Sequence, residues 1–197
     1  MEVGSWELGV NVIRKVEWQL SAPESELSAL RAGDAVELSG GVLTLRDASA
    51  ARLASTLARH EPLPISLHDR IMYAVGPSPA KPGQVIGSAG PTTTARMGRY
   101  LPALFAAGVR AIIGKGELHG ADMAACLEHG AVYLAAIGGL GALLAKRITA
   151  ARVVAYPELG PEALFELELA AFPAVVIIDR AGQNLHDTAR SQWRTEP

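Results

Sequence analysis

Three threonines and an arginine gather in the segment GPTTTARMGRYL, immediately before an apolar stretch. The hydroxyls belong to Thr92, Thr93 and Thr94, and the guanidinium belongs to Arg96. We predict a helix after PTTT, and a helix start offers free backbone N–H groups and a partial positive charge. Hydroxyls and a cation at that point favour a carboxylate or phosphate site. The alternative is that one threonine caps the helix and that Arg96 points into solvent.

Two further cations follow predicted strands. Lys115 stands between Gly114 and Gly116, which allow the backbone to turn tightly around an uncrowded side chain. Arg46 precedes Asp47, which we expect to cap a helix. Ligands of α/β sheets bind at the carboxyl ends of strands, so these cations are expected to meet the threonine segment at one cleft. The alternative for each is an ordinary turn or cap residue.

No self-contained catalytic pattern accompanies these cations. The five histidines are scattered without metal-ligand spacing, and the glycine–lysine run lacks the spacing of a P-loop. The one cysteine, Cys126, lies in an apolar predicted helix and is expected to be a buried structural thiol. A single thiol excludes a cysteine-ligated iron–sulfur cluster built by this chain alone and favours a reducing compartment. The chain therefore supplies cations and hydroxyls but no metal site, and resembles half of an active site.

The elements that position these residues fall into three parts. Residues 1–45 are predicted to be β-rich, with strands at 35–38 and 42–45 joined by a Gly-Gly turn. From 46 to 157, short apolar strands alternate with helices, and QVIGSAG is predicted to be the strand that leads into PTTT. In residues 158–197, GPEALFELELA is predicted as a helix, AVVIIDRAG as a strand and TARSQWRTEP as a frayed polar tail. The alternation predicts an α/β fold with a mixed, partly parallel sheet and a β-rich N-terminal part.

The composition of the chain limits the classes of partner and the cellular location that we expect. A net charge of −2 over 197 residues gives no electrostatic reason to bind nucleic acid or an anionic membrane. The N-terminus lacks the pattern of a signal peptide, and the apolar run at 131–145 is too short and glycine-rich to span a bilayer. We therefore expect a cytoplasmic protein.

The order of several motifs resembles a known family, the β subunit of class I, iron–sulfur-dependent fumarate hydratases and L(+)-tartrate dehydratases. The same region forms the C-terminal domain where the two halves are fused. The motifs are GDAVELSGGVLTLRDASAARL, GPTTTARMGRYL, AIIGKG, HGAVYLAAIGGLGALLAKRI and YPELGPEALFELELAAFPAVVIIDRAGQNL. The resemblance covers about residues 30–186 and implies a swivelling β/β/α domain at 29–190. Residues 1–28 are then an N-terminal extension, expected to be β, and 191–197 a polar tail.

The resemblance also implies a chemistry. Members reversibly add water across the double bond of a dicarboxylic acid, and a [4Fe–4S] cluster held by cysteines of the α subunit acts as the Lewis acid. By this resemblance Arg46, Arg96 and Lys115 bind the substrate carboxylates, and Thr92, with Thr93 beside it, is the candidate for proton transfer. The isolated chain is then expected to be inactive, and to form a dimer or heterotetramer with an α subunit.

Two positions depart from the family pattern. The usual histidine after RDAA is Ala50, and the usual aspartate after RM is Gly98. Three hypotheses therefore stay open: the β subunit of a hydro-lyase acting on a fumarate-, malate- or tartrate-type acid, a non-catalytic domain that binds a dicarboxylate or a partner, and a structural subunit without a ligand.

Overall fold

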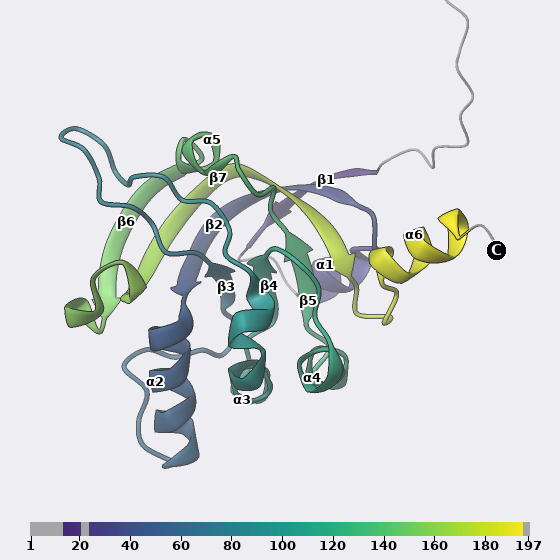
Figure 1. Cartoon of the computed structure of the whole chain (residues 1–197), viewed down its shortest axis with the longest axis horizontal. Helices are drawn as coiled ribbons and strands as arrows, with labels where there is room; N and C mark the ends of the chain where they lie inside the picture. Colours follow the sequence, from purple (N-terminus) through teal and green to yellow (C-terminus); the bar gives the residue numbers. More distant parts are fainter. Residues whose placement is uncertain (1–13, 21–23, 195–197) are drawn as a thin grey trace, which may run out of the picture.

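A mixed sheet of seven strands organises the chain in the order β1-β2-β3-β4-β5-β7-β6 (Figure 1). The structure is a computed structural model, and it describes residues 14–20 and 24–194. The strands are β1 (Lys15–Gln19), β2 (Ala35–Leu45), β3 (Ile71–Ala74), β4 (Ala111–Gly114), β5 (Val132–Ala135), β6 (Ile148–Ala155) and β7 (Leu164–Ile178). The helices are α1 (Glu24–Ala29), α2 (Asp47–Ala58), α3 (Leu101–Ala106), α4 (Gly120–Glu128), α5 (Gly141–Ala145) and α6 (Leu185–Trp193), with 3₁₀ helices η1 (Thr94–Tyr100) and η2 (Pro157–Glu162).

The strand pairings close a ring. Strands β1 to β5 pair in parallel, each with the next. Strand β7 pairs antiparallel with β5, β6 and β2, so that β2, β3, β4, β5 and β7 each have a neighbour on both sides. The predicted α/β class with a mixed, partly parallel sheet is therefore confirmed.

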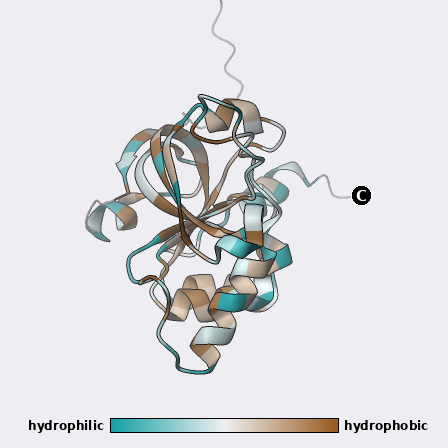
Figure 2. Cartoon of the chain, turned by 90° about the vertical axis from the view of Figure 1, so that its left-hand side faces the viewer, coloured by the Kyte–Doolittle hydropathy of each residue, from teal (hydrophilic) through white to brown (hydrophobic). Residues whose placement is uncertain are grey.

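Two hydrophobic cores form because neighbouring strand residues face opposite sides of the sheet. On β3, Ile71 and Tyr73 enter one core, and Met72 and Ala74 enter the other. The first core draws residues from all five strands of the ring. The second lies under α2, α3 and α4, which lie side by side on one side of the sheet, whereas α5 lies on the other (Figure 1). In side view the long strands bend strongly, and the helices alternate hydrophobic and hydrophilic residues (Figure 2).

Two of the predicted elements near the long strands are wrong. The predicted strands 35–38 and 42–45 are one strand, β2, because Gly40 takes a φ of +118° at a register shift against β7 instead of forming a turn. The predicted helix across GPEALFELELA is largely the first half of β7. There the ELEL run buries Leu167 and Leu169 and turns Glu166 and Glu168 outward, so the two-residue period outweighs local helix propensity.

Three further elements differ in extent. QVIGSAG forms no strand and belongs to a long loop, and the helix predicted after PTTT is divided between η1 and α3. Helix α6 extends to Trp193, into the predicted polar tail. Residues 1–13 and 21–23 of the predicted N-terminal extension lie outside the described residues. Within the described part, no helix is both long and apolar enough to cross a membrane.

Candidate functional site

The carboxyl ends of β2, β3 and β4 bring the predicted site residues to one edge of the sheet. Arg46 directly follows β2. The Thr92 N–H donates a 2.8 Å hydrogen bond to the carbonyl of Ala74, the last residue of β3. Thr93 forms a parallel bridge with Lys115, which directly follows β4. Because the three strands are adjacent and parallel, residues from distant parts of the sequence meet here.

A shallow hollow of about 540 Å³ opens beside these strand ends. Its lining consists of glycine, proline and serine: Gly76, Pro77, Ser78, Ser88, Gly90, Pro91, Gly139, Gly141 and Pro161. The Arg46 guanidinium packs against one part of this lining, since a Cβ on Gly76 would lie 2.3 Å from Nη1. The Lys115 side chain passes Gly138, with Cδ 3.6 Å from the place of a Cβ there. Arg46 therefore contacts the lining of the hollow, and Lys115 passes the glycine that precedes another part of that lining.

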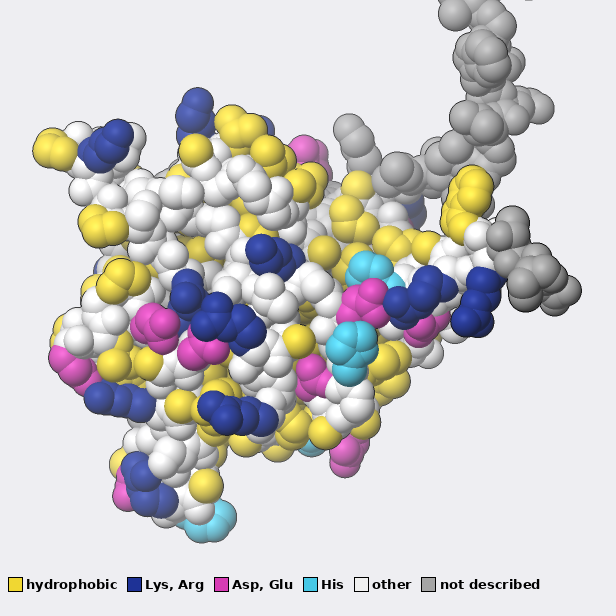
Figure 3. All heavy atoms as spheres, in the orientation of Figure 1, with side chains coloured by type: hydrophobic (Ala, Val, Ile, Leu, Met, Phe, Trp, Pro, Cys, Tyr) yellow, Lys and Arg dark blue, Asp and Glu magenta, His cyan; other side chains and the backbone are white. Residues whose placement is uncertain are grey.

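Carboxylates of the chain itself accompany the two arginines. Asp47 Oδ2 lies 3.0 Å from Arg96 Nη2 and 3.7 Å from Arg46 Nε, and Glu162 Oε1 lies 3.6 Å from Arg46 Nη2. These contacts are ion pairs and not hydrogen bonds. Within the described part of the chain, Asp47 Oδ2 and Arg46 Nε are both buried without a hydrogen-bond partner. The prediction that Asp47 caps α2 is wrong: Arg46 is the N-cap residue, and Asp47 begins the helix. Basic and acidic side chains are accordingly interspersed on this face (Figure 3).

The three threonines separate into one buried and two accessible residues. Thr94 is fully buried, and its Oγ1 accepts a 3.1 Å hydrogen bond from the hydroxyl of Tyr133. Burial raises the pKa of that tyrosine to about 12, so its hydroxyl stays protonated. Thr92 and Thr93 are half-buried, which leaves their hydroxyls available to a ligand. Position 114, at the end of β4, has room only for glycine, since a Cβ there would lie 1.9 Å from Thr94 Oγ1.

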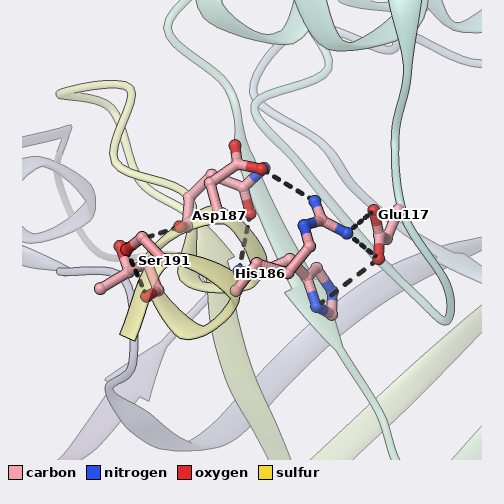
Figure 4. A network of polar contacts seen from close by, with 7 residues as sticks. Glu117, His186, Asp187 and Ser191 are labelled. Carbon is pink, nitrogen blue, oxygen red and sulfur yellow. Dashed lines mark hydrogen bonds and ion pairs between the residues drawn. The ribbon is translucent and has the colours of Figure 1, made fainter. Parts of the chain in front are cut away.

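A polar network holds the loop that carries Lys115 (Figure 4). Glu117, two residues further on, accepts hydrogen bonds from Arg190 Nη1 at 2.9 Å on both carboxylate oxygens. Arg190 also donates to Asp187 at 2.8 Å, and His186 Nδ1 lies 4.0 Å from Glu117. The hydrogen bonds from Arg190 hold the pKa of Glu117 below its usual value. Sequence reasoning missed this network, because Arg190, which joins its two carboxylates, lies in the segment predicted to fray.

Comparison with known proteins decides the family. The family model described as the fumarase C-terminus matches residues 5–189. The chain belongs to the fumarase C-terminus family. The match begins within residues 1–28, the segment predicted to be an N-terminal extension.

Relatives in this family differ in length. An aerobic class I fumarate hydratase of Salmonella typhimurium is 35% identical over 182 residues, which cover 89% of this chain and 31% of the relative. The aerobic enzyme of Escherichia coli K12 is 36% identical over 162 residues, or 81% of this chain and 30% of the relative. The chain thus spans about a third of these fumarate hydratases. A Methanocaldococcus jannaschii protein named as an L(+)-tartrate dehydratase β subunit is 35% identical over 170 residues, covering 83% of this chain and 87% of the relative.

The two departures from the family pattern have different surroundings. A Cβ on Gly98 would lie 2.8 Å from Asp122 Oδ2, so a carboxylate from α4 already occupies the space beside this position. Asp122 is buried, and its Oδ1 accepts from the N–H groups of His119 at 2.8 Å and Met123 at 3.0 Å. Ala50 is fully buried in the second core. At Gly98 the neighbouring Asp122 therefore still supplies a carboxylate, whereas at Ala50 the side chain makes only apolar contacts.

The residues present do not fit the iron–sulfur cluster that the family resemblance implies. Cys126 is the one cysteine of the chain; it is fully buried, and its thiol donates to the Ala131 carbonyl at 3.4 Å. Burial raises its pKa to about 12, which keeps the sulfur protonated, whereas a cluster ligand must be a thiolate. Over residues 14–20 and 24–194, no group of three or more histidine, cysteine, aspartate or glutamate side chains is arranged to hold a metal ion.

Proposed function

We propose that this chain is the β subunit of an iron–sulfur hydro-lyase that reversibly hydrates or dehydrates a small dicarboxylic acid of the fumarate/malate or tartrate type. The observation that carries the proposal is that Arg46, Thr92 and the Thr93–Lys115 bridge lie at the ends of three adjacent parallel strands, beside a hollow lined by glycine, proline and serine. Arg96 joins them from η1 through its 3.0 Å ion pair with Asp47. Ligands of α/β sheets bind at such strand ends. The names of the relatives supply the reaction class.

In this proposal the cations bind and orient the two carboxylates of the substrate. Arg46 and Arg96 offer planar guanidinium groups that pair with a carboxylate through two parallel hydrogen bonds, which fixes orientation as well as position. Lys115 provides a compact charge from the next strand end. Thr92 holds its hydroxyl beside the reacting carbon, with Thr93 next to it, as the proton-transfer group. A free hydroxyl is a weak base, so Thr92 requires activation by groups that surround it in the assembled enzyme.

We assign the cluster to a partner α subunit, since the cysteines to hold it are missing from this chain. The tartrate dehydratase relative supports a separate β chain, because this chain covers 87% of that relative's length. Three exposed apolar residues, Ile137, Leu140 and Leu143, lie on the segments that line the hollow or border its lining, and we assign them to the α contact. The assembly would be a cytoplasmic dimer or heterotetramer that binds neither nucleic acid nor membrane.

One observation favours the alternative of a non-catalytic domain that binds a dicarboxylate or a partner. Ala50 replaces the histidine of the family pattern, and an alanine can neither donate nor accept a proton. The alternative keeps the carboxylate contacts of Arg46, Arg96 and Lys115 and removes turnover.

Anaerobic co-expression with α chains, followed by an absorbance assay on fumarate, malate and tartrate, tests the proposal. We expect turnover from the complex, and a colourless, inactive chain when it is purified alone. The Arg96 side chain is 56% exposed in this chain, so Arg96→Ala is expected to weaken dicarboxylate binding by about 1 kcal/mol, the upper end for exposed charge pairs. Thr92→Val should lower kcat more than it raises KM. A stoichiometric iron–sulfur chromophore on the chain alone contradicts the assignment, and dicarboxylate binding without turnover in every complex supports the alternative.

The α contact has its own test in a matched pair of variants. Leu140 and Leu127 are 38% and 37% exposed, but Leu140 precedes α5 beside the hollow, whereas Leu127 lies in the last turn of α4, away from the strand-end loop. Leu140→Arg is expected to weaken co-purification with the α chain at least tenfold, and Leu127→Arg to leave it within twofold. Equal effects would refute this docking face.

A further inference from the structure

The segment YPELGPEA, residues 156–163, contributes no cation or hydroxyl to the proposed site, yet it lies against the start of α2. Its residue Glu162 contacts two parts of that helix start. Oε2 accepts a 2.8 Å hydrogen bond from the Ala48 N–H, one of the free donors at the beginning of the helix. Oε1 lies 3.6 Å from Arg46 Nη2. A single carboxylate from a segment more than a hundred residues away therefore bridges the helix backbone and the guanidinium.

The Arg46 guanidinium needs such a constraint. Its side chain is 24% exposed, and its buried Nε has no hydrogen-bond partner among residues 14–20 and 24–194. Gly76 leaves room for it on one side, but an open contact does not select one orientation of a long side chain. Asp47 is the other carboxylate nearby, and it lies closer to Arg96, at 3.0 Å, than to Arg46, at 3.7 Å. Glu162 is therefore the carboxylate that faces Arg46 without being shared with a second arginine.

We propose that Glu162 is a positioning residue, which fixes the orientation of the Arg46 guanidinium relative to the N-terminus of α2. Anchored to Ala48, the carboxylate holds the Nη2 side of the guanidinium and leaves Nη1, which lies beside Gly76 of the hollow, for a ligand carboxylate. The catalytic consequence rests on the proposed function, whereas the contact itself does not.

Positioning and simple charge compensation predict opposite results for Glu162→Gln. The glutamine keeps an oxygen for the Ala48 N–H and removes the negative charge opposite Arg46. If Glu162 only offset the arginine charge, its removal would leave the site more positive and would tighten the binding of an anionic substrate. If it orients Arg46, the substrate still binds, but the reacting geometry is lost and kcat falls.

Glu158→Gln is the matched control. Glu158 belongs to the same segment and pairs with Arg52 on the surface, with both side chains about half exposed. In the assembled α/β enzyme, Glu162→Gln is expected to lower kcat at least tenfold with KM changed less than threefold, and Glu158→Gln to leave both within twofold. A kcat for Glu162→Gln equal to that of Glu158→Gln, or a lowered KM with unchanged kcat, would overturn the proposal.

A second readout works on the full chain without its partner. In ¹⁵N NMR spectra, the Nε–Hε signal of Arg46, assigned by its loss in Arg46→Lys, is expected to shift or broaden in Glu162→Gln and to stay unchanged in Glu158→Gln. An unchanged Arg46 signal in Glu162→Gln overturns the positioning role, whatever the activity. A changed signal together with an inactive reference complex upholds the contact and counts against the proposed function alone.

Discussion

Replacing Gly76 with alanine tests whether the place of the Arg46 guanidinium governs the chemistry of the site. A Cβ at this position would lie 2.3 Å from Arg46 Nη1 and 3.0 Å from Cζ. Ordinary heavy-atom contacts are about 3.5 Å or more, so the guanidinium must move by about 1 Å. The atoms that collide belong to the end of a flexible side chain, and Gly76 does not have a positive φ. The strain is therefore relieved by moving Arg46 and not by distorting the strand end.

The magnitude follows from this displacement. A 1 Å misplacement of a group that orients a substrate costs on the order of 100-fold in rate, or about 2.7 kcal/mol in the activation barrier. The free energy of unfolding should stay within about 1 kcal/mol, because alanine also restricts the unfolded chain. We therefore expect kcat/KM of the assembled enzyme to fall about 100-fold, with a urea midpoint that shifts by no more than about 0.5 M.

Gly41→Ala is the control for this variant. It adds the same methyl group to β2 with an ordinary 3.7 Å contact to Glu168, and it should change neither activity nor stability. Full activity in Gly76→Ala would show that the site does not depend on the observed place of Arg46. A large loss of stability in Gly76→Ala would mean that the collision is borne by the backbone.

Three further predictions concern stability and reactivity. Gly114→Ala places a Cβ 1.9 Å from the buried Thr94 Oγ1, and urea unfolding should show a loss of about 1–3 kcal/mol. Burial alone would raise the pKa of Asp34, but its hydrogen bonds from the Arg14 side chain and from a backbone N–H hold that pKa below the usual value. The ionised Asp34 carboxylate therefore stabilises the fold above about pH 4, and this stabilisation is lost as the pH falls further. In urea unfolding, Asp34→Asn should lower the free energy of unfolding by about 1–3 kcal/mol at pH 7 and by progressively less below pH 4. Burial raises the pKa of Cys126 to about 12. At pH 8 its reaction with a thiol-specific disulfide reagent should be on the order of 100-fold slower in the folded chain than in urea. Rapid reaction of the native protein would contradict its burial.

Local sequence patterns were enough to predict the short strands β3 and β4, the helix α4 and the residues at the ends of these elements. The apolar run of β3 is followed by Val-Gly-Pro, that of β4 ends in Gly-Lys-Gly, and α4 ends before Gly130, which has a φ of +59°. Because parallel strands place their carboxyl ends together, the grouping of Arg46 and Lys115 followed from these elements. Thr92 was expected there because of a strand predicted at QVIGSAG, which does not form; its N–H instead bonds to the end of β3. The family resemblance independently named the same residues.

The long strands and the carboxylates of the site depend on contacts that local patterns do not encode. The ELELA run is compatible with a helix until β7 pairs with β2, more than a hundred residues earlier in the chain. Glu162, Asp122 and Glu117 reach the site from elements whose position depends on that pairing or on the helix layer. A carboxylate beside a helix start gives no sequence signal when its partner belongs to another part of the chain. Sequence therefore revealed the cations but not the anions that accompany them.

The ring of strands has a consequence for synthesis on the ribosome. Strand β7 closes the ring by pairing with both β2 and β5, and it begins only at Leu164. Before this segment has emerged from the ribosome, a nascent chain can pair β2 through β5, but the edges of β2 and β5 that β7 will cover stay unpaired. Unpaired strand edges favour association between chains. Folding must therefore finish after most of the chain has been translated, and products interrupted before Leu164 should accumulate as aggregates or as substrates of the cell's proteases.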